Sequence, residues 1–133
     1  MKKEVQEKYL ELQLLQRQLQ AVHQQIEALE SQAQEMDIVH AALDDFSRTK
    51  KGSEMFVTLT PGLFVKAKLE ETENVVLNVG GSAMVQKSIP EAKEIVANQG
   101  SELRKLQEEL ADQMRKLQEQ AEKAQEELRK LVE

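Results

Sequence analysis

The residues that could carry out chemistry in this chain are few, and their spacing suits no reaction. His23 and His40 stand alone, and without Cys they lack the partners of a zinc site. Gly80-Gly81 is not followed by the Lys and Ser or Thr of a phosphate-binding loop. Ser and Asp residues show no nucleophile-elbow or triad context. We therefore expect no enzyme, no catalytic residues, no metal site and no cofactor.

Charge and composition narrow the class of partner. The 133 residues carry a net charge of −6, with 32% charged and 3% aromatic residues and no Trp. Neither half has a basic excess, which argues against nucleic acid or an anionic membrane as partner. The start of the sequence lacks the apolar stretch of a signal peptide, and no apolar run is long enough to span a membrane. The absence of Cys fits a reducing compartment, so we expect a cytoplasmic protein.

Two heptad-patterned segments of similar length, from about Lys3 to Ser47 and from about Ile89 to Glu133, are expected to be long helices. In the first, apolar residues recur with the 3.5-residue period of a coiled coil, and Lys8 is the one charged residue among them. The second has a thinner seam, interrupted by Gly100, a residue that weakens helices. Folded back as an antiparallel coiled coil, the two helices pair residues whose numbers sum to about 136, so Val5 faces Leu131. Both ends of the sequence then lie together.

Apolar residues off the seam gather near the start of the first helix. Leu10 and Leu14 lie four residues apart at outward positions, next to Tyr9. One interpretation is scattered surface residues, which are common. The other is an exposed apolar patch used for binding.

Four short strand patterns fill the centre, at 54–60, 63–69, 74–79 and 82–87. Pro61-Gly62 and Gly80-Gly81 favour tight turns, which predicts two hairpins. Alternation places one set of residues on a common inward face: Met55, Val57, Leu59, Leu63, Val65, Ala67, Leu69, Val75, Leu77, Val79, Ala83 and Val85. The other face still carries Phe56, Phe64, Val76 and Met84.

Hairpins that are apolar on both faces are not stable alone in water. We therefore expect them to join strands of other subunits in a shared sheet or barrel. The alternative is a private four-stranded sheet packed on the bases of the helices. The predicted fold is α+β, a long antiparallel coiled-coil hairpin with two central β-hairpins. It forms one domain over 1–133, with helices at 1–49 and 89–133 and the hairpins at 53–88.

The order of these parts and the two hairpin sequences, at 52–69 and 75–88, resemble prefoldin, the ATP-independent holdase chaperone. Two hairpins rather than one are similar to its alpha class, and the short termini resemble archaeal members. Pro61 departs from the family's expected turn. The resemblance implies a hexamer of two alpha and four single-hairpin beta subunits, joined through a double β-barrel. It also implies that non-native proteins are held by the coiled-coil tips and passed to a group II chaperonin.

Mapped onto this sequence, the resemblance assigns two sets of residues. The client-binding tip set is Val5, Tyr9, Leu10, Leu12, Leu14, Leu128, Leu131 and Val132. The hairpin interface set is Met55, Phe56, Val57, Leu59, Leu63, Phe64, Val65, Val75, Val76, Leu77, Val79, Met84 and Val85. Two alternatives remain open, namely a structural coiled-coil scaffold with a defined partner and a homo-oligomeric, filament-forming relative of prefoldin.

Overall fold

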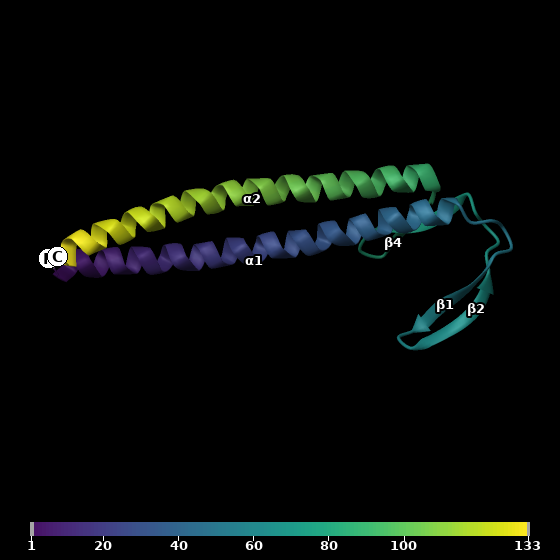
Figure 1. Cartoon of the computed structure of the whole chain (residues 1–133), viewed down its shortest axis with the longest axis horizontal. Coiled ribbons are helices and arrows are strands. Elements are labelled where there is room, and N and C mark those ends of the chain that lie inside the picture. The colour runs from purple at the N-terminus through teal and green to yellow at the C-terminus, as the bar shows by residue number, and fades with distance from the viewer. Residues whose placement is uncertain (1, 133) are drawn as a thin grey trace. The chain divides into compact units, whose positions relative to one another are not determined.

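The computed structural model describes residues 2–132 and contains two long helices and two β-hairpins (Figure 1). In chain order the elements are α1 (Lys2–Ser47), β1 (Glu54–Thr60), β2 (Leu63–Lys68), β3 (Asn74–Gly80), β4 (Ala83–Ser88) and α2 (Ile89–Val132). The predicted element types and order are confirmed. No helix among the described residues is long and apolar enough to cross a membrane.

The chain forms two compact units, and both helices contribute to each. The first unit holds α1 up to Ala33 and α2 from Ser101. The second runs from Gln34 to Gly100 and contains both hairpins. Gly100 is the last residue of the second unit and lies within α2.

In the first unit the two helices bury a narrow stripe of side chains. Its buried residues are Leu15, Val22, Ala33 and Ala124, all at positions where the heptad repeat places the seam. The antiparallel register is the predicted one, since Glu30 accepts a hydrogen bond from the Gln107 side chain at 2.8 Å. The stripe combines small Ala with larger Leu and Val side chains, and helices approach closely where one side chain is small.

In the second unit Leu43, Ala92 and Val96 form a buried cluster between the helices. Met36, Val39, Val75 and Leu77 pack against this cluster, so the β3–β4 hairpin lies on the helices of its own chain. Met36 lies beside Gly100, since a Cβ at Gly100 would lie 3.6 Å from the Met36 Cβ, an ordinary van der Waals distance.

Ser88 caps the start of α2. The Ser88 hydroxyl oxygen accepts a hydrogen bond from the Glu91 amide at 3.3 Å, and the hydroxyl donates to the Glu91 carboxylate at 2.8 Å. The Ser88 side chain thus satisfies a backbone amide in the first turn of the helix, and the Glu91 carboxylate accepts from the Ser88 hydroxyl.

The hairpins form two separate two-stranded antiparallel sheets. Val57 pairs with Val65 in the first, and Leu77 pairs with Val85 in the second, so each pair shares the predicted face. The alternative of a private four-stranded sheet is wrong, because no strand of one hairpin pairs with a strand of the other among the described residues. The tight turns place Gly62 at φ 85° and Gly81 at φ 56°, values that favour glycine.

Replacement of Leu43 with Ala should destabilise the second unit by about 2–5 kcal/mol, the usual loss for a buried leucine. Leu43 is 7% exposed and has Ala92 and Val96 as neighbours, so a cavity would remain. Chemical denaturation followed by circular dichroism measures the change. Ile38→Ala is the matched control, because Ile38 lies in the same helix with 68% of its surface exposed. Equal losses in both variants would contradict the assigned core.

Candidate functional site

An apolar groove lies in the first unit, near the ends of the two helices, and has a volume of about 470 Å³. It is lined by Val5, Gln6, Tyr9 and Leu10 of α1, together with Leu128 and Val132 of α2. These residues recur at intervals of four on each helix, which places them on one side of the seam. The walls of the groove therefore come from both helices, and the groove exists only while the helices are paired at this end.

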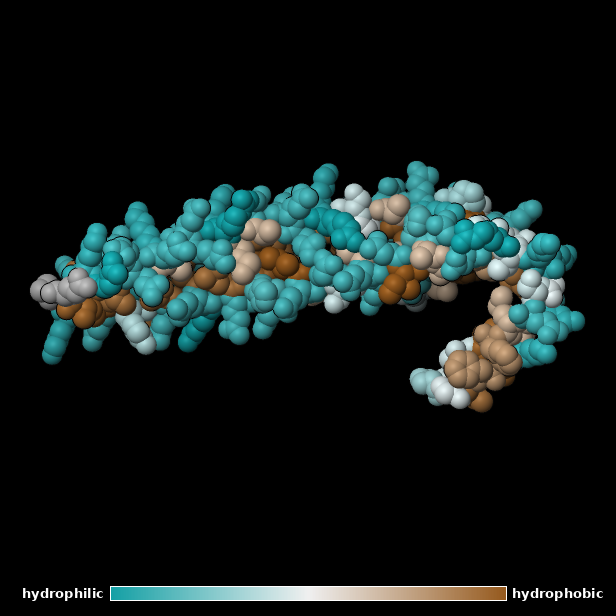
Figure 2. All heavy atoms as spheres, viewed as in Figure 1, coloured by the Kyte–Doolittle hydropathy of each residue, from teal (hydrophilic) through white to brown (hydrophobic). Residues whose placement is uncertain are grey.

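The groove side chains are largely in solvent. Leu10 is 62% exposed and Val132 is 70% exposed, while Val5 and Leu128 are half-buried because they also contact the seam. Figure 2 shows apolar atoms collected at this end of the helices. An open apolar groove with one amide side chain offers contact area and little hydrogen-bonding specificity.

The eight predicted tip residues lie at different sites in the structure. Five of them line the groove: Val5, Tyr9, Leu10, Leu128 and Val132. Leu14 is exposed one turn beyond Leu10 and extends the apolar surface along α1. Leu12 is half-buried at its predicted seam position, and Leu131 lines a different hollow.

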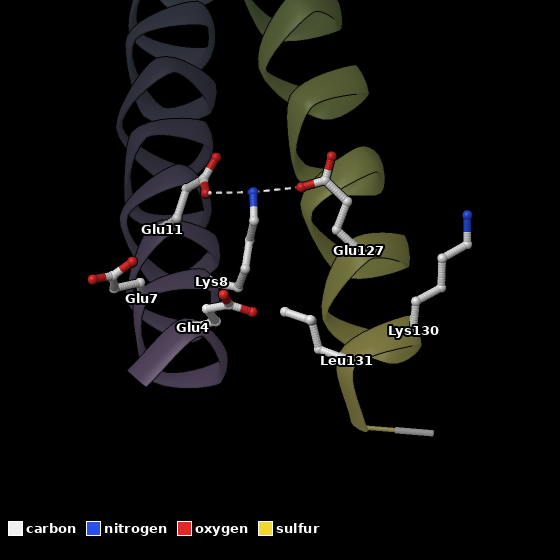
Figure 3. A pocket seen from close by; sticks show the side chains of 7 residues that line it. All are labelled: Glu4, Glu7, Lys8, Glu11, Glu127, Lys130 and Leu131. Atoms are coloured by element: carbon white, nitrogen blue, oxygen red, sulfur yellow. Dashed lines mark hydrogen bonds and ion pairs between the residues drawn. The ribbon is translucent and has the colours of Figure 1, made fainter. Parts of the chain in front are cut away.

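That second hollow, of about 460 Å³, is lined mainly by charged residues and is drawn in Figure 3. Helical periodicity places its α1 residues, Glu4, Glu7, Lys8 and Glu11, on the flank of the seam opposite the groove. Its α2 residues are Glu127, Lys130 and Leu131. Lys8 reaches between the helices, with its Nζ 3.2 Å from Glu11 Oε2 and in contact with Glu127 Oε2. Glu7 and Lys130 point away from this contact (Figure 3).

The ion pair between Lys8 and Glu127 shifts the pKa of both side chains. The hydrogen bond from Lys8 holds the pKa of Glu127 below its ordinary value, and the same hydrogen bond raises the pKa of Lys8. A lowered carboxylate pKa stabilises the paired state above the ordinary Glu pKa, and this contribution is lost as pH falls through the lowered value. The raised Lys8 pKa gives a contribution that is complete below the ordinary Lys pKa and is lost as pH rises through the raised value.

The hairpins present a second apolar surface. On the predicted inward face of β1–β2, Val57, Leu59, Leu63 and Val65 are exposed, whereas Met55 is half-buried. The opposite face carries Phe56, which is 73% exposed, and Phe64. Figure 2 shows apolar atoms over this hairpin.

The β3–β4 hairpin is partly covered by its own chain. Val75, Leu77 and Val85 are half-buried, and the first two pack against the helices. Val79, Val76 and Met84 stay exposed. The predicted interface residues on β1–β2 are therefore mostly exposed, whereas some of those on β3–β4 are partly covered by the helices.

Sequence reasoning missed two exposed apolar positions on the helices, Ile38 and Leu106. Leu106 contributes to a shallow groove of about 380 Å³ whose other apolar lining residues are Ala28, Leu29 and Leu110. A signal was present in the sequence, because Leu106 falls off the heptad seam in the same way as Leu10.

The two histidines have neighbours one turn further along α1. His23 Nε2 lies 2.9 Å from Glu27 Oε1, and His40 Nδ1 lies 3.9 Å from Asp44 Oδ2. Within residues 2–132, no group of three His, Cys, Asp or Glu side chains is arranged to hold a metal ion.

Comparison with known proteins points to one family. The family described as "Prefoldin subunit" matches residues 15–133. "Prefoldin subunit alpha" of Methanothrix thermoacetophila is 36% identical over 64 residues, which cover 48% of this chain and 42% of that one. The protein of the same name from Thermofilum pendens is 31% identical over 74 residues, covering 56% and 57%. The chain thus spans about half the length of the curated relatives it matches.

The fold also has a solved counterpart. A cryo-EM structure of filamentous PFD from Methanocaldococcus jannaschii aligns with a TM-score of 0.79 at 18% sequence identity. The alignment covers 86% of this chain and 95% of that one.

Replacement of Lys8 with Met should return the Glu127 pKa upward toward its ordinary value, because the hydrogen bond that lowers it is removed. A carbon-detected NMR titration of the side-chain carboxyl measures the shift. The control is Asp44, whose pKa is lowered by its hydrogen bond from Lys93 and which should keep its value in the variant. An unchanged Glu127 titration would contradict the interhelical pair.

Proposed function

Because the chain belongs to the prefoldin family, we propose that it is a subunit of an ATP-independent chaperone that holds non-native proteins at the tips of its coiled coil. Members of this family form oligomeric complexes with other prefoldin subunits. The observation that carries the proposal is the apolar groove between the helix ends, with Leu10, Val132 and the adjacent Leu14 in solvent.

The chemistry of the groove suits an unfolded client. A non-native protein exposes apolar side chains in no fixed order, so its receptor needs apolar area without sequence-specific polar contacts. The groove supplies such area, but one short groove binds weakly. Several tips in one assembly would act together on one client and raise the overall affinity by avidity.

The assembly we propose contains two copies of this alpha-type chain and four single-hairpin beta subunits. The apolar face of β1–β2 supports it, because Val57, Leu59, Leu63 and Val65 are exposed. Strands of neighbouring subunits would pair with the hairpin edges and bury this face in a β-barrel. We further propose that the complex is cytoplasmic and passes its client to a group II chaperonin.

Replacement of both Leu10 and Leu14 with Ser should weaken client holding, because it removes exposed apolar surface at the tip. Light scattering of guanidinium-denatured lysozyme, diluted into the assembled complex, reports the loss as faster aggregation. Leu106→Ser is the matched control, since it removes an exposed leucine of the same unit away from the tip. Equal loss in the control would place client binding along the whole coiled coil, and no loss in the double variant would refute the tip assignment.

Replacement of Val65 with Asp should block assembly, because a charge would then be buried in the barrel face. Native mass spectrometry of the chain, alone and with single-hairpin subunits of the same source, measures the outcome. Thr58→Asp is the control on the opposite face of the same hairpin. For the unsubstituted chain mixed with single-hairpin subunits, a complex of two copies of this chain and four of the others supports the proposal. A filament or stable dimer in both samples would favour the homo-oligomeric or scaffold alternative.

A further inference from the structure

Lys8 occupies an unusual place in the coiled coil. The heptad repeat assigns it to the seam, where the repeat otherwise places apolar side chains on α1. It is half-buried, and its ammonium group meets one carboxylate from each helix, Glu11 of α1 and Glu127 of α2 (Figure 3). Lys8 thus links the two helices at the level of the groove.

Apolar burial is less complete at this end of the seam than further along it. The seam residues Val5, Leu12, Leu128 and Leu131 are all half-buried, whereas Leu15 and Ala124, further along the helices, are buried. Part of the apolar surface at this end therefore stays in solvent and does not contribute to helix pairing. The ion pair on the flank opposite the groove supplies an additional attraction between the helices.

We propose that Lys8 is a positioning residue for client binding, which holds the ends of α1 and α2 together through Glu127 and so keeps the two walls of the apolar groove in place. The proposal rests on the proposed holdase function. Its reasoning is geometric, because Val5, Tyr9 and Leu10 lie on one wall while Leu128 and Val132 lie on the other. Separation of the helix ends would leave two apolar stripes and no groove.

A second consequence follows from the exposure of the pair. Ions in solution screen an exposed ion pair over about 8 Å at physiological ionic strength. Salt should therefore loosen the tip and reduce client holding. An apolar residue in place of Lys8 should keep the helix ends paired at any salt concentration, because its contribution is not Coulombic.

The test combines the distance between the helix ends with the suppression of aggregation. The sequence has no Cys, so Lys3→Cys with Arg129→Cys gives one spin-label pair across the helix ends. Electron-electron resonance distances and lysozyme aggregation are measured for the parent, Lys8→Glu, the charge swap Lys8→Glu with Glu127→Lys, and Lys8→Leu. Lys116→Glu is the matched control, since it makes the same charge change on the exposed surface of α2. Native mass confirms the same assembly in every variant.

We expect Lys8→Glu to lengthen the label distance and to reduce client holding by roughly two- to fivefold, the range that an exposed ion pair covers. The charge swap should restore both readouts, and Lys8→Leu should hold client equally at low and high salt. The proposal would be overturned if Lys8→Glu left the label distance unchanged. It would also be overturned if this variant separated the helix ends and held client more strongly. A parent complex that never delays aggregation would instead refute the holdase function, and the distances alone would then decide whether Lys8 pairs the helices.

Discussion

The structure depends on the narrowness of the stripe that two paired helices can bury. In the first unit the buried side chains all lie on that stripe, and in the second they gather where the helices meet the β3–β4 hairpin. Apolar residues outside these places, such as Leu10, Phe56 and Val65, have no core to enter. The chain therefore leaves apolar surface at the helix ends and on the hairpins, in addition to Ile38 and Leu106. The two surfaces differ in kind, since one is an open groove and the other has strand edges.

Polar residues at seam positions fix how the helices pair. Lys8 contacts Glu127, Gln107 donates to Glu30, and Lys93 contacts Asp44. The partner numbers sum to 135, 137 and 137, so each contact satisfies the same antiparallel register. Apolar seam residues alone discriminate poorly between registers that differ by one heptad, because leucines are still buried when one helix is shifted by seven residues. A polar residue in the seam loses its carboxylate partner on slipping, which makes the correct register the preferred one.

The heptad repeat and the turn residues were sufficient to predict the elements, the register and the exposure of Leu10 and Leu14, because these follow from local periodicity. Contacts between distant segments could not be predicted in this way. Periodicity marks Lys8 as a seam residue but does not say that two carboxylates surround it. Alternation places Val75 and Leu77 on an apolar face, yet their packing on Leu43 depends on how the hairpin folds back onto the helices. The private four-stranded sheet was wrong for the same reason, since the turns specify each hairpin and not the relation between hairpins.

The tip of a holdase of the kind proposed faces a conflict between pairing and binding. Val5 and Leu128 belong both to the seam and to the groove, so every part of their surface that is buried in pairing is lost to a client. A deeper insertion of these two residues into the seam would stabilise the end of the coiled coil and remove their surface from the groove. The contact of Lys8 with Glu127 avoids this conflict, because it joins the helices from the flank opposite the groove and uses no apolar surface. Charge pairing on one side thus leaves the apolar side chains on the other side free for a client.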